Sequence, residues 1–146
     1  MNIYLSSSWK NRERVHLLAM KLRKEGYDVY DFTDQLRRKE VGLAPENFPT
    51  LFDPDEHIYK WYLEDRPELR KGVEENRKAL ERCDAVVMLL PCGNDAHADA
   101  YYGKGFGKKL IISGQPRRGD VSPTHLWADE MVDYDGEVPQ ALARLL

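Results

Sequence analysis

Hydrophobic and polar residues alternate along the first part of this chain in a way that predicts a strand, a helix and a second strand. Residues Asn2–Leu5 and Tyr27–Phe32 are apolar at alternate positions, which is typical of strands. Between them, over Trp9–Glu25, apolar residues stand among charged ones at helical spacing, and Gly26 follows where a helix-terminating glycine belongs. Two strands joined through a helix predict a parallel pair.

The second half of the chain continues this pattern. Asp84–Pro91 is apolar on both faces, as expected for the central strand of a parallel sheet covered by helices. Helices are predicted before it, over Pro67–Arg82, and after it, over Asp95–Phe106. Three more elements follow, namely a strand at Lys109–Ser113, a short strand at Met131–Tyr134 and a closing helix at Glu137–Leu146. The predicted fold class is α/β, with a small doubly wound (Rossmann- or flavodoxin-like) parallel sheet of about five strands in a single domain, residues 1–146.

Residues Thr33–Arg66 are the least regular part of the chain. They contain three prolines and a group of aromatic residues, Phe48, Phe52, Tyr59, Trp61 and Tyr62. A loop of this length in a small domain is usually functional or partly disordered. The density of aromatic side chains favours a folded lid or pocket wall.

Composition and charge narrow the class of protein. Of 146 residues, 42% are hydrophobic and 32% are charged, which suits a folded domain with a polar surface. The net charge of −3 does not provide the basic surface that a nucleic-acid polymer requires, so none is expected as a partner. The longest apolar stretch, Ala85–Cys92, is too short to cross a membrane, and the first residues lack the features of a signal peptide. Two cysteines, Cys83 and Cys92, do not make a disulfide framework, which favours a reduced, cytoplasmic setting.

Polar residues follow three of the predicted strands, at the carboxyl ends where open parallel sheets bind ligands. Ser6–Ser8 follow the first strand, Asp31–Asp34 the second and Pro91–Asp99 the central one. The serines suit an anion held by hydroxyls and helix amides, with Arg12 and Arg14 one turn further on. Alternatively, Ser7 or Ser8 only caps the helix that follows.

Two carboxylates share one face of the predicted helix after the central strand. Asp95 and Asp99 are four residues apart and lie near the positive end of the helix dipole, which favours their ionised forms. An ionised carboxylate there can act as a nucleophile at a sugar carbon or as a base. In the alternative interpretation, both acids only stabilise the start of the helix. His97 lies between them and points elsewhere on the helix.

Two other signals are weak in this chain. The four histidines do not have the spacing of metal ligands, so no metal site is expected. The glycine-rich stretch Gly103–Gly107 follows a helix rather than a strand, unlike the dinucleotide-binding fingerprint. It is predicted to allow tight packing and to end the helix.

In these features the chain resembles the nucleoside 2-deoxyribosyltransferase-like family, which includes deoxynucleoside monophosphate N-hydrolases. The similarity extends over nearly the whole chain. The matching blocks are Ile3–Asn11, Gly26–Phe32, Cys83–Gly93, Ala96-His97 and Gly105–Lys108. The block around the central strand is the longest and the most specific.

The resemblance implies cleavage or transfer at the N-glycosidic bond of a nucleoside or nucleotide. In the family, a carboxylate attacks C1′ of a deoxyribosyl group, the base leaves, and the glycosyl-enzyme intermediate passes to another base or to water. The family nucleophile is a glutamate on the helix after the central strand, and the matching residue here is Asp99. Tyr4 matches the tyrosine that holds this carboxylate by a hydrogen bond.

The resemblance also implies a substrate site and an assembly. Substrate-binding residues are expected at the three strand ends, at Ser6, Ser7, Trp9, Asp31, Phe32, Gly93 and His97. Among them, Ser6 and Ser7 would line the sugar or phosphate, and Asp31 and Phe32 would border the base. No cofactor is implied, because the intermediate needs only a carboxylate. Family members assemble as dimers or larger oligomers, so a homodimer or higher homo-oligomer is expected.

This chain departs from the family pattern at three positions on the same helix. Asp99 is one methylene shorter than the usual glutamate, and Tyr101 is bulkier than the usual glycine and of a size to fill the space left. Asp95 replaces a serine, and its carboxylate would repel a 5′-phosphate or take over part of the catalytic role. Two interpretations follow: an N-glycosidase or deoxyribosyltransferase, and a catalytically altered or inactive nucleotide-binding module on the same scaffold.

Overall fold

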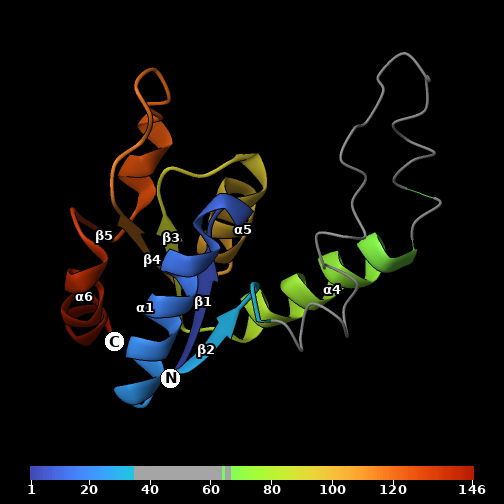
Figure 1. The fold of residues 1–146 in the computed structure, drawn as a ribbon, viewed down its shortest axis with the longest axis horizontal. Helices are drawn as coiled ribbons and strands as arrows, with labels where there is room; N and C mark the ends of the chain where they lie inside the picture. Colours follow the sequence, from blue (N-terminus) through green and yellow to red (C-terminus); the bar gives the residue numbers. More distant parts are fainter. Residues whose placement is uncertain (35–63, 65–66) are drawn as a thin grey trace.

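The computed structural model of the chain describes residues 1–34, 64 and 67–146 (Figure 1). Most of the irregular segment Thr33–Arg66 therefore lies outside the described residues. Its predicted role as a lid or pocket wall stays a prediction.

Five parallel strands form one sheet in the described part of the chain. In chain order they are β1 (Asn2–Ser6), β2 (Asp28–Asp31), β3 (Ala85–Leu89), β4 (Lys109–Ser113) and β5 (Glu130–Val132). In space the order is β2-β1-β3-β4-β5, so the chain adds β2 on one side of β1 and builds the rest on the other side (Figure 1). The direction in which successive strands are added reverses between β1 and β3. In an open parallel sheet, the ligand crevice forms at this switch point, outside the carboxyl ends of the strands. The predicted doubly wound α/β fold is confirmed.

Helices and short 3-10 turns connect the strands. The helices are α1 (Arg12–Lys24), α4 (Pro67–Arg82), α5 (Asn94–Gly105) and α6 (Val138–Leu145), and the 3-10 turns are η1 (Trp9–Asn11), η4 (Pro123–Trp127) and η5 (Asp135–Glu137). The prediction of one helix from Trp9 was wrong at its start, where η1 precedes α1. The sequence also predicts a loop over Gly114–Thr124, and this prediction was wrong at its end, because Pro123 and Thr124 lie within η4.

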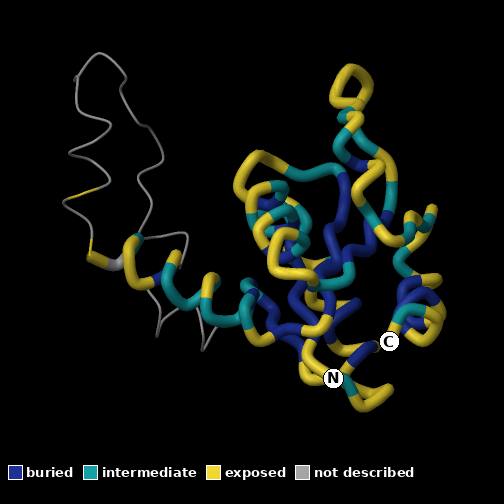
Figure 2. Tube along the Cα trace, turned by 180° about the vertical axis from the view of Figure 1, so that it is seen from behind, coloured by how far each residue is buried: buried dark blue, intermediate teal, exposed yellow. Residues whose placement is uncertain are grey.

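Successive side chains of each strand point to opposite faces of the sheet. Ile3 and Leu5 of β1 pack in a cluster with α1 and α6, whereas Tyr4 packs in a second cluster with α4 and α5. The buried members of the first cluster are all aliphatic, but the second also contains tyrosine, cysteine and methionine side chains. Figure 2 shows the buried strands between these two layers of helices.

Helix α4 contacts the sheet through its carboxyl-terminal half. Leu80 is 2% exposed, whereas Val73, two turns earlier, is 66% exposed. Figure 2 shows the amino-terminal part of α4 standing away from the buried body. The segment of α4 around Leu80 is therefore the part that packs against the sheet.

Two glycines have a clear structural reason. Gly26 follows α1 with a φ of +93°, a left-handed conformation that glycine adopts without strain. A Cβ atom on Gly103 of α5 would lie 2.6 Å from Cγ2 of Val86, so only glycine allows α5 to pack this closely on β3. The predicted packing role of the glycine-rich stretch is confirmed at this position.

None of the helices that the structure describes is long and apolar enough to cross a lipid bilayer.

Cys83 and Cys92 are both free thiols, and burial raises the pKa of each to about 11.

Candidate functional site

Tyr4 and Asp99 meet between β1 and α5, although 95 residues separate them in sequence. The hydroxyl of Tyr4 donates a hydrogen bond of 2.7 Å to Oδ2 of Asp99. Strand β1 directs Tyr4 toward α5, and only 1% of Tyr4 is exposed. The structure thus contains the tyrosine–carboxylate hydrogen bond that the family resemblance implies.

The environment of Asp99 tunes its charge. Burial is the main cause that raises the pKa of Asp99, to about 6; the Tyr4 hydrogen bond lowers it and the nearby Asp95 carboxylate raises it further. Asp99 is therefore mostly ionised at pH 7 and carries a proton in mildly acidic solution. Burial and Asp99 together raise the pKa of Tyr4 well above its usual value, so Tyr4 remains a protonated donor.

Only one oxygen of the Asp99 carboxylate is engaged by the described side chains. Oδ2 accepts from Tyr4, and no hydrogen bond to Oδ1 is formed within the described ranges. Asp95, one helical turn earlier, is exposed. A carboxylate held at one oxygen with the other available can act as a nucleophile or as a base.

A second tyrosine lies directly behind Tyr4. The rings of Tyr4 and Tyr30 are parallel, with centroids 4.9 Å apart and an interplanar angle of 7°. The hydroxyl of Tyr30 donates a 2.8 Å hydrogen bond to Oδ1 of Asn76 on α4. A continuous chain of contacts thus crosses β2 and β1, and its members are Asn76, Tyr30, Tyr4 and Asp99.

The hydroxyls of the three serines at the end of β1 all form hydrogen bonds with backbone groups of the protein. Ser6 donates to the carbonyl of Ala96 at 2.9 Å, and Ser7 donates to the carbonyl of Leu89 at 2.9 Å. The hydroxyl of Ser8 accepts from the backbone N–H of Lys10, so Ser8 caps the 3-10 turn η1, whereas the N-cap of helix α1 is Asn11. Ser6 and Ser7 lie at the predicted strand end, but the hydroxyl of each donates its hydrogen bond to a backbone carbonyl of the protein.

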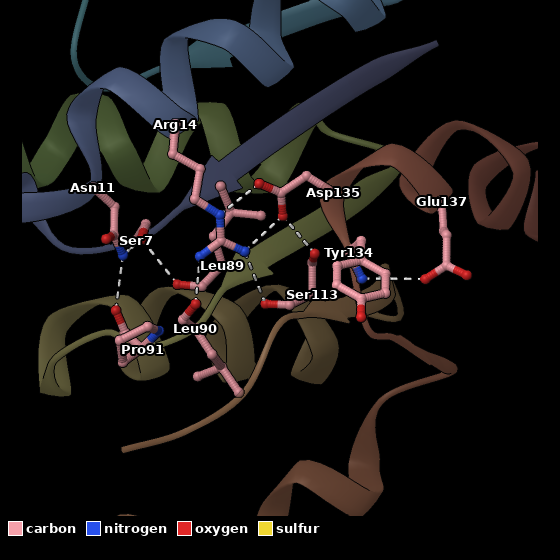
Figure 3. Close-up of polar contacts among 10 residues, drawn as sticks. All are labelled: Ser7, Asn11, Arg14, Leu89, Leu90, Pro91, Ser113, Tyr134, Asp135 and Glu137. Carbon is pink, nitrogen blue, oxygen red and sulfur yellow. Dashed lines mark hydrogen bonds and ion pairs between the residues drawn. The ribbon is translucent and has the colours of Figure 1, made fainter.

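Three successive carbonyls at the end of β3 receive side chains from the segment after β1, as Figure 3 shows. Ser7 donates to Leu89, Arg14 to Leu90, and Asn11 to Pro91 at 2.8 Å; Asn11 also donates to Ser7 at 2.8 Å. We call these three donors the carbonyl clamp. It ties the β1–α1 connection to the turn that leads into α5.

The clamp is completed by an ion pair (Figure 3). Arg14 binds Asp135 through two hydrogen bonds, with Nε 2.5 Å from Oδ2 and Nη2 2.6 Å from Oδ1. Ser113 at the end of β4 donates to the same carboxylate at 2.6 Å. Both groups lower the pKa of Asp135 against the effect of burial. The expectation that Arg14 supplies charge to an anion after β1 is wrong for this structure, because Asp135 already neutralises it.

Asp31 and Phe32, which are expected to border the base, lie at the end of β2, and Trp9 of η1 packs against Phe32. Trp9 and Phe32 form an edge-to-face pair with centroids 5.1 Å apart. Asp31 is fully buried, and its Oδ1 accepts from the backbone and hydroxyl of Thr33 at 2.7 Å and 2.6 Å. His16 lies 3.4 Å from the other oxygen. The Asp31 carboxylate is thus held by groups of the protein.

His97 faces away from Asp99, toward η4. Its Nδ1 lies 2.9 Å from the carbonyl of Gly93, the residue before α5, and its Nε2 lies 3.0 Å from Nε2 of His125. The two rings stack at 5.3 Å. Tyr101 points the same way and shares a 2.6 Å hydrogen bond with Thr124. The expectation that Tyr101 fills the space beside Asp99 is therefore wrong.

Sequence reasoning missed His125 and the turn η4 that carries it. Ser122 followed by Pro123 is a signal for a helical start, and it could have indicated η4. Burial and the neighbouring His97 lower the pKa of His125. No sequence signal predicts that these two histidines pair.

Among the described residues, neither a group of possible metal ligands nor the groove along α1 involves Asp99. In the chain as described, no three histidine, cysteine, aspartate or glutamate side chains gather in a way that could hold a metal ion. A groove of about 550 Å³ lies instead along α1 and η5, lined by residues that include Leu17, Lys21 and Gly136. It does not include Asp99.

Comparison with known proteins supports the fold. No protein-family model and no curated protein sequence matches the chain. Among solved structures, the CMP N-glycosidase BcmB of Clostridium botulinum is similar, with a TM-score of 0.54 and 14% sequence identity over 98% of this chain and 99% of that one. Sir2Af2, solved with a myristoylated histone peptide, has a TM-score of 0.46 and 12% identity over 98% and 89% of the two chains. The chain therefore shares the fold of a CMP N-glycosidase.

Proposed function

We propose that this protein cleaves the N-glycosidic bond of a nucleoside or nucleotide, with Asp99 as the nucleophile, and that it belongs to the nucleoside 2-deoxyribosyltransferase-like family. The observation that carries the proposal is the 2.7 Å hydrogen bond from Tyr4 to Asp99, which lies next to the switch point of the sheet. The fold that contains this bond is similar to that of a CMP N-glycosidase. A carboxylate oriented at one oxygen and ionised near neutral pH is what attack at C1′ requires.

The reaction has two steps on the same carboxylate. In the first, Oδ1 of Asp99 forms a bond to C1′ while the bond from C1′ to the base nitrogen breaks, and the electron pair leaves with the base, which takes a proton from solvent. In the second, water attacks C1′, the ester bond breaks, and its electron pair returns to Asp99 while solvent takes the proton. Tyr4 keeps its hydrogen bond to Oδ2 and orients the carboxylate in both steps. Transfer to a second base in place of water would make the protein a deoxyribosyltransferase.

Charge around Asp99 favours substrates without a 5′-phosphate. Asp95 is exposed and close enough to raise the pKa of Asp99, so a phosphate at this side would meet two carboxylates. Ser6 and Ser7 give their hydroxyl protons to the backbone, and Arg14 is neutralised by Asp135. We therefore expect nucleosides to react faster than their 5′-monophosphates.

Release of free base measured by chromatography tests the proposal. The purified protein is incubated with a panel of ribo- and deoxyribonucleosides, their 5′-monophosphates and NAD-like dinucleotides, beside the Asp99→Asn variant. Asp28→Asn is the matched control, because Asp28 is an exposed acid at the start of β2, the opposite edge of the sheet.

The proposal requires base release by the wild type and by Asp28→Asn, and its loss in Asp99→Asn. Base release that is equally fast in Asp99→Asn would refute it. Saturable binding of nucleosides without any base release would identify a binding module on the same scaffold.

A further inference from the structure

The aromatic pair behind Asp99 is built into the register of the sheet. Tyr4 and Tyr30 are direct neighbours in the parallel pairing of β1 with β2, and both point to the face covered by α4 and α5. Their rings are stacked at 4.9 Å and within 7° of parallel. Neighbouring strands thus hold the two rings as one block.

The position of a phenol hydroxyl follows from the plane of its ring, since the oxygen lies in that plane. Tyr4 can direct its O–H to Oδ2 of Asp99 only while its ring keeps its orientation. In the sheet, Tyr4 is paired with Val86 of β3 on one side and with Tyr30 of β2 on the other, and the ring of Tyr30 covers one face of its own ring, so a tilt of Tyr30 would allow a tilt of Tyr4. The orientation of the nucleophile therefore depends on a residue that does not touch it.

Tyr30 is itself fixed from outside the sheet. Its hydroxyl donates to Oδ1 of Asn76, a half-buried residue in the part of α4 that packs on the sheet. Tyr30 is 8% exposed, so loss of this acceptor would leave a largely buried hydroxyl without this partner. The hydrogen bond ties α4 to the aromatic pair.

We propose that Tyr30 and Asn76 are positioning residues for Asp99, acting through the ring of Tyr4. This inference rests on the proposed function for its effect on rate, but not for its effect on the Asp99 carboxyl group. It assigns to α4 a role in catalysis, since the hydrogen bond from Tyr30 fixes the direction in which Tyr4 donates.

Two variants separate the hydroxyl of Tyr30 from its ring. Tyr30→Phe keeps the stack and removes the hydrogen bond to Asn76, and Asn76→Ala removes the acceptor. Asn76→Asp retains an acceptor oxygen and is the conservative rescue. Tyr27→Phe is the matched control, because Tyr27 packs on the opposite face of the sheet.

We expect Tyr30→Phe and Asn76→Ala each to lower kcat about tenfold with little change in KM, since misplacement of the reacting group affects the transition state more than binding. The double variant should be no slower than either single one, because both remove the same bond. Asn76→Asp should recover most of kcat, and Tyr27→Phe should match the wild type.

A titration that needs no turnover provides the second readout. The Asp99 carboxyl carbon is followed by NMR against pH, with Tyr4 on β1 and Asp95 on α5 as the ionisable groups that act on it. A weaker hydrogen bond from Tyr4 disfavours the ionised form, so both variants should raise the titration midpoint. Tyr27→Phe should leave it near the wild-type value; Asn76→Asp adds a carboxylate that can itself raise the midpoint, as Asp95 does, so this variant is compared by its kcat alone.

An unchanged midpoint in Tyr30→Phe and Asn76→Ala would overturn the inference, even if kcat fell through loss of folded protein. A wild type that releases no base would reject the proposed function alone, and the titration would then decide the positioning role by itself.

Discussion

The two faces of the sheet differ in chemistry although the same strands supply both. The face under α1 and α6 is a continuous aliphatic core with an ion pair, Arg14–Asp135, at its carboxyl edge. The face under α4 and α5 contains Tyr4, Tyr30 and a partly buried carboxylate, Asp99. Aliphatic burial stabilises the fold, whereas a buried carboxylate with a raised pKa lowers stability. The first face therefore contributes mainly to stability, and the second carries the residues to which we assign the proposed chemistry.

The largest expected effect comes from Asp99→Asn on the second face. Base release should fall by at least about a thousandfold, because the proposed nucleophile is removed. The folded state should become more stable by on the order of 1–2 kcal/mol at pH 7, since the carboxylate has a pKa raised to about 6 by burial. Chromatography of the base and denaturant unfolding measure the two effects. A variant that loses activity and stability together would place Asp99 in the structural core instead.

A matching change on the first face should do the reverse. Leu22→Ala removes a fully buried side chain from α1 and should lower the free energy of unfolding by about 2–5 kcal/mol. The folded fraction should keep the wild-type kcat and pH profile, because Leu22 packs away from Tyr4. Urea unfolding with assays at pH 6 and pH 8 measures both. A shifted pH profile would mean that the two faces are not separate in function.

Tyr4→Phe tests the hydrogen bond at the site. The ring remains stacked on Tyr30, but the donor to Asp99 is lost. We expect kcat to fall about 10- to 100-fold. In the wild type, activity should decline as the pH falls through about 6, because protonation would remove the ionised carboxylate that we propose as the nucleophile. In Tyr4→Phe this decline should begin at a higher pH, since the hydrogen bond lowers the pKa of Asp99. Identical pH profiles would show that the bond does not tune the carboxylate.

The smallest effect concerns the histidine pair at the outer side of α5. The pKa of His125 is lowered in the folded protein, so below about pH 6.5 the unfolded chain binds its proton more readily and stability declines. His125→Gln should remove less than about 1 kcal/mol of the stability lost between pH 7 and pH 5. Thermal melting at both pH values measures this difference, and an equal loss in wild type and variant would contradict it.

Most of the fold could be predicted from the sequence because its signals are local. The predicted boundaries of α4 and β4 agree with the structure at both ends, and the apolar Asp84–Pro91 contains the central strand. Turn η4 was missed because only Ser122-Pro123 marks its start, and apolar periodicity does not extend through it. Local periodicity decides whether an element forms, and it does so best for long elements.

The candidate site could be predicted only in part, because its contacts are long-range. The Tyr4–Asp99 bond followed from a family resemblance, and no pattern along the chain indicates it. The pairs Arg14–Asp135, Tyr30–Asn76 and His97–His125 join residues whose separations carry no periodic signal. Their side chains meet only because the topology brings the strand ends and helices together.

Mass spectrometry of the acid-quenched protein during turnover tests the role of Asp99 most directly. With a reactive nucleoside, the Asp99 peptide should gain the mass of one glycosyl group, and Asp99→Asn should gain none. A glycosyl group on Asp95 would show that Asp95, and not Asp99, is the nucleophile. Base release without any adduct, retained in Asp99→Asn, would contradict a covalent role for Asp99.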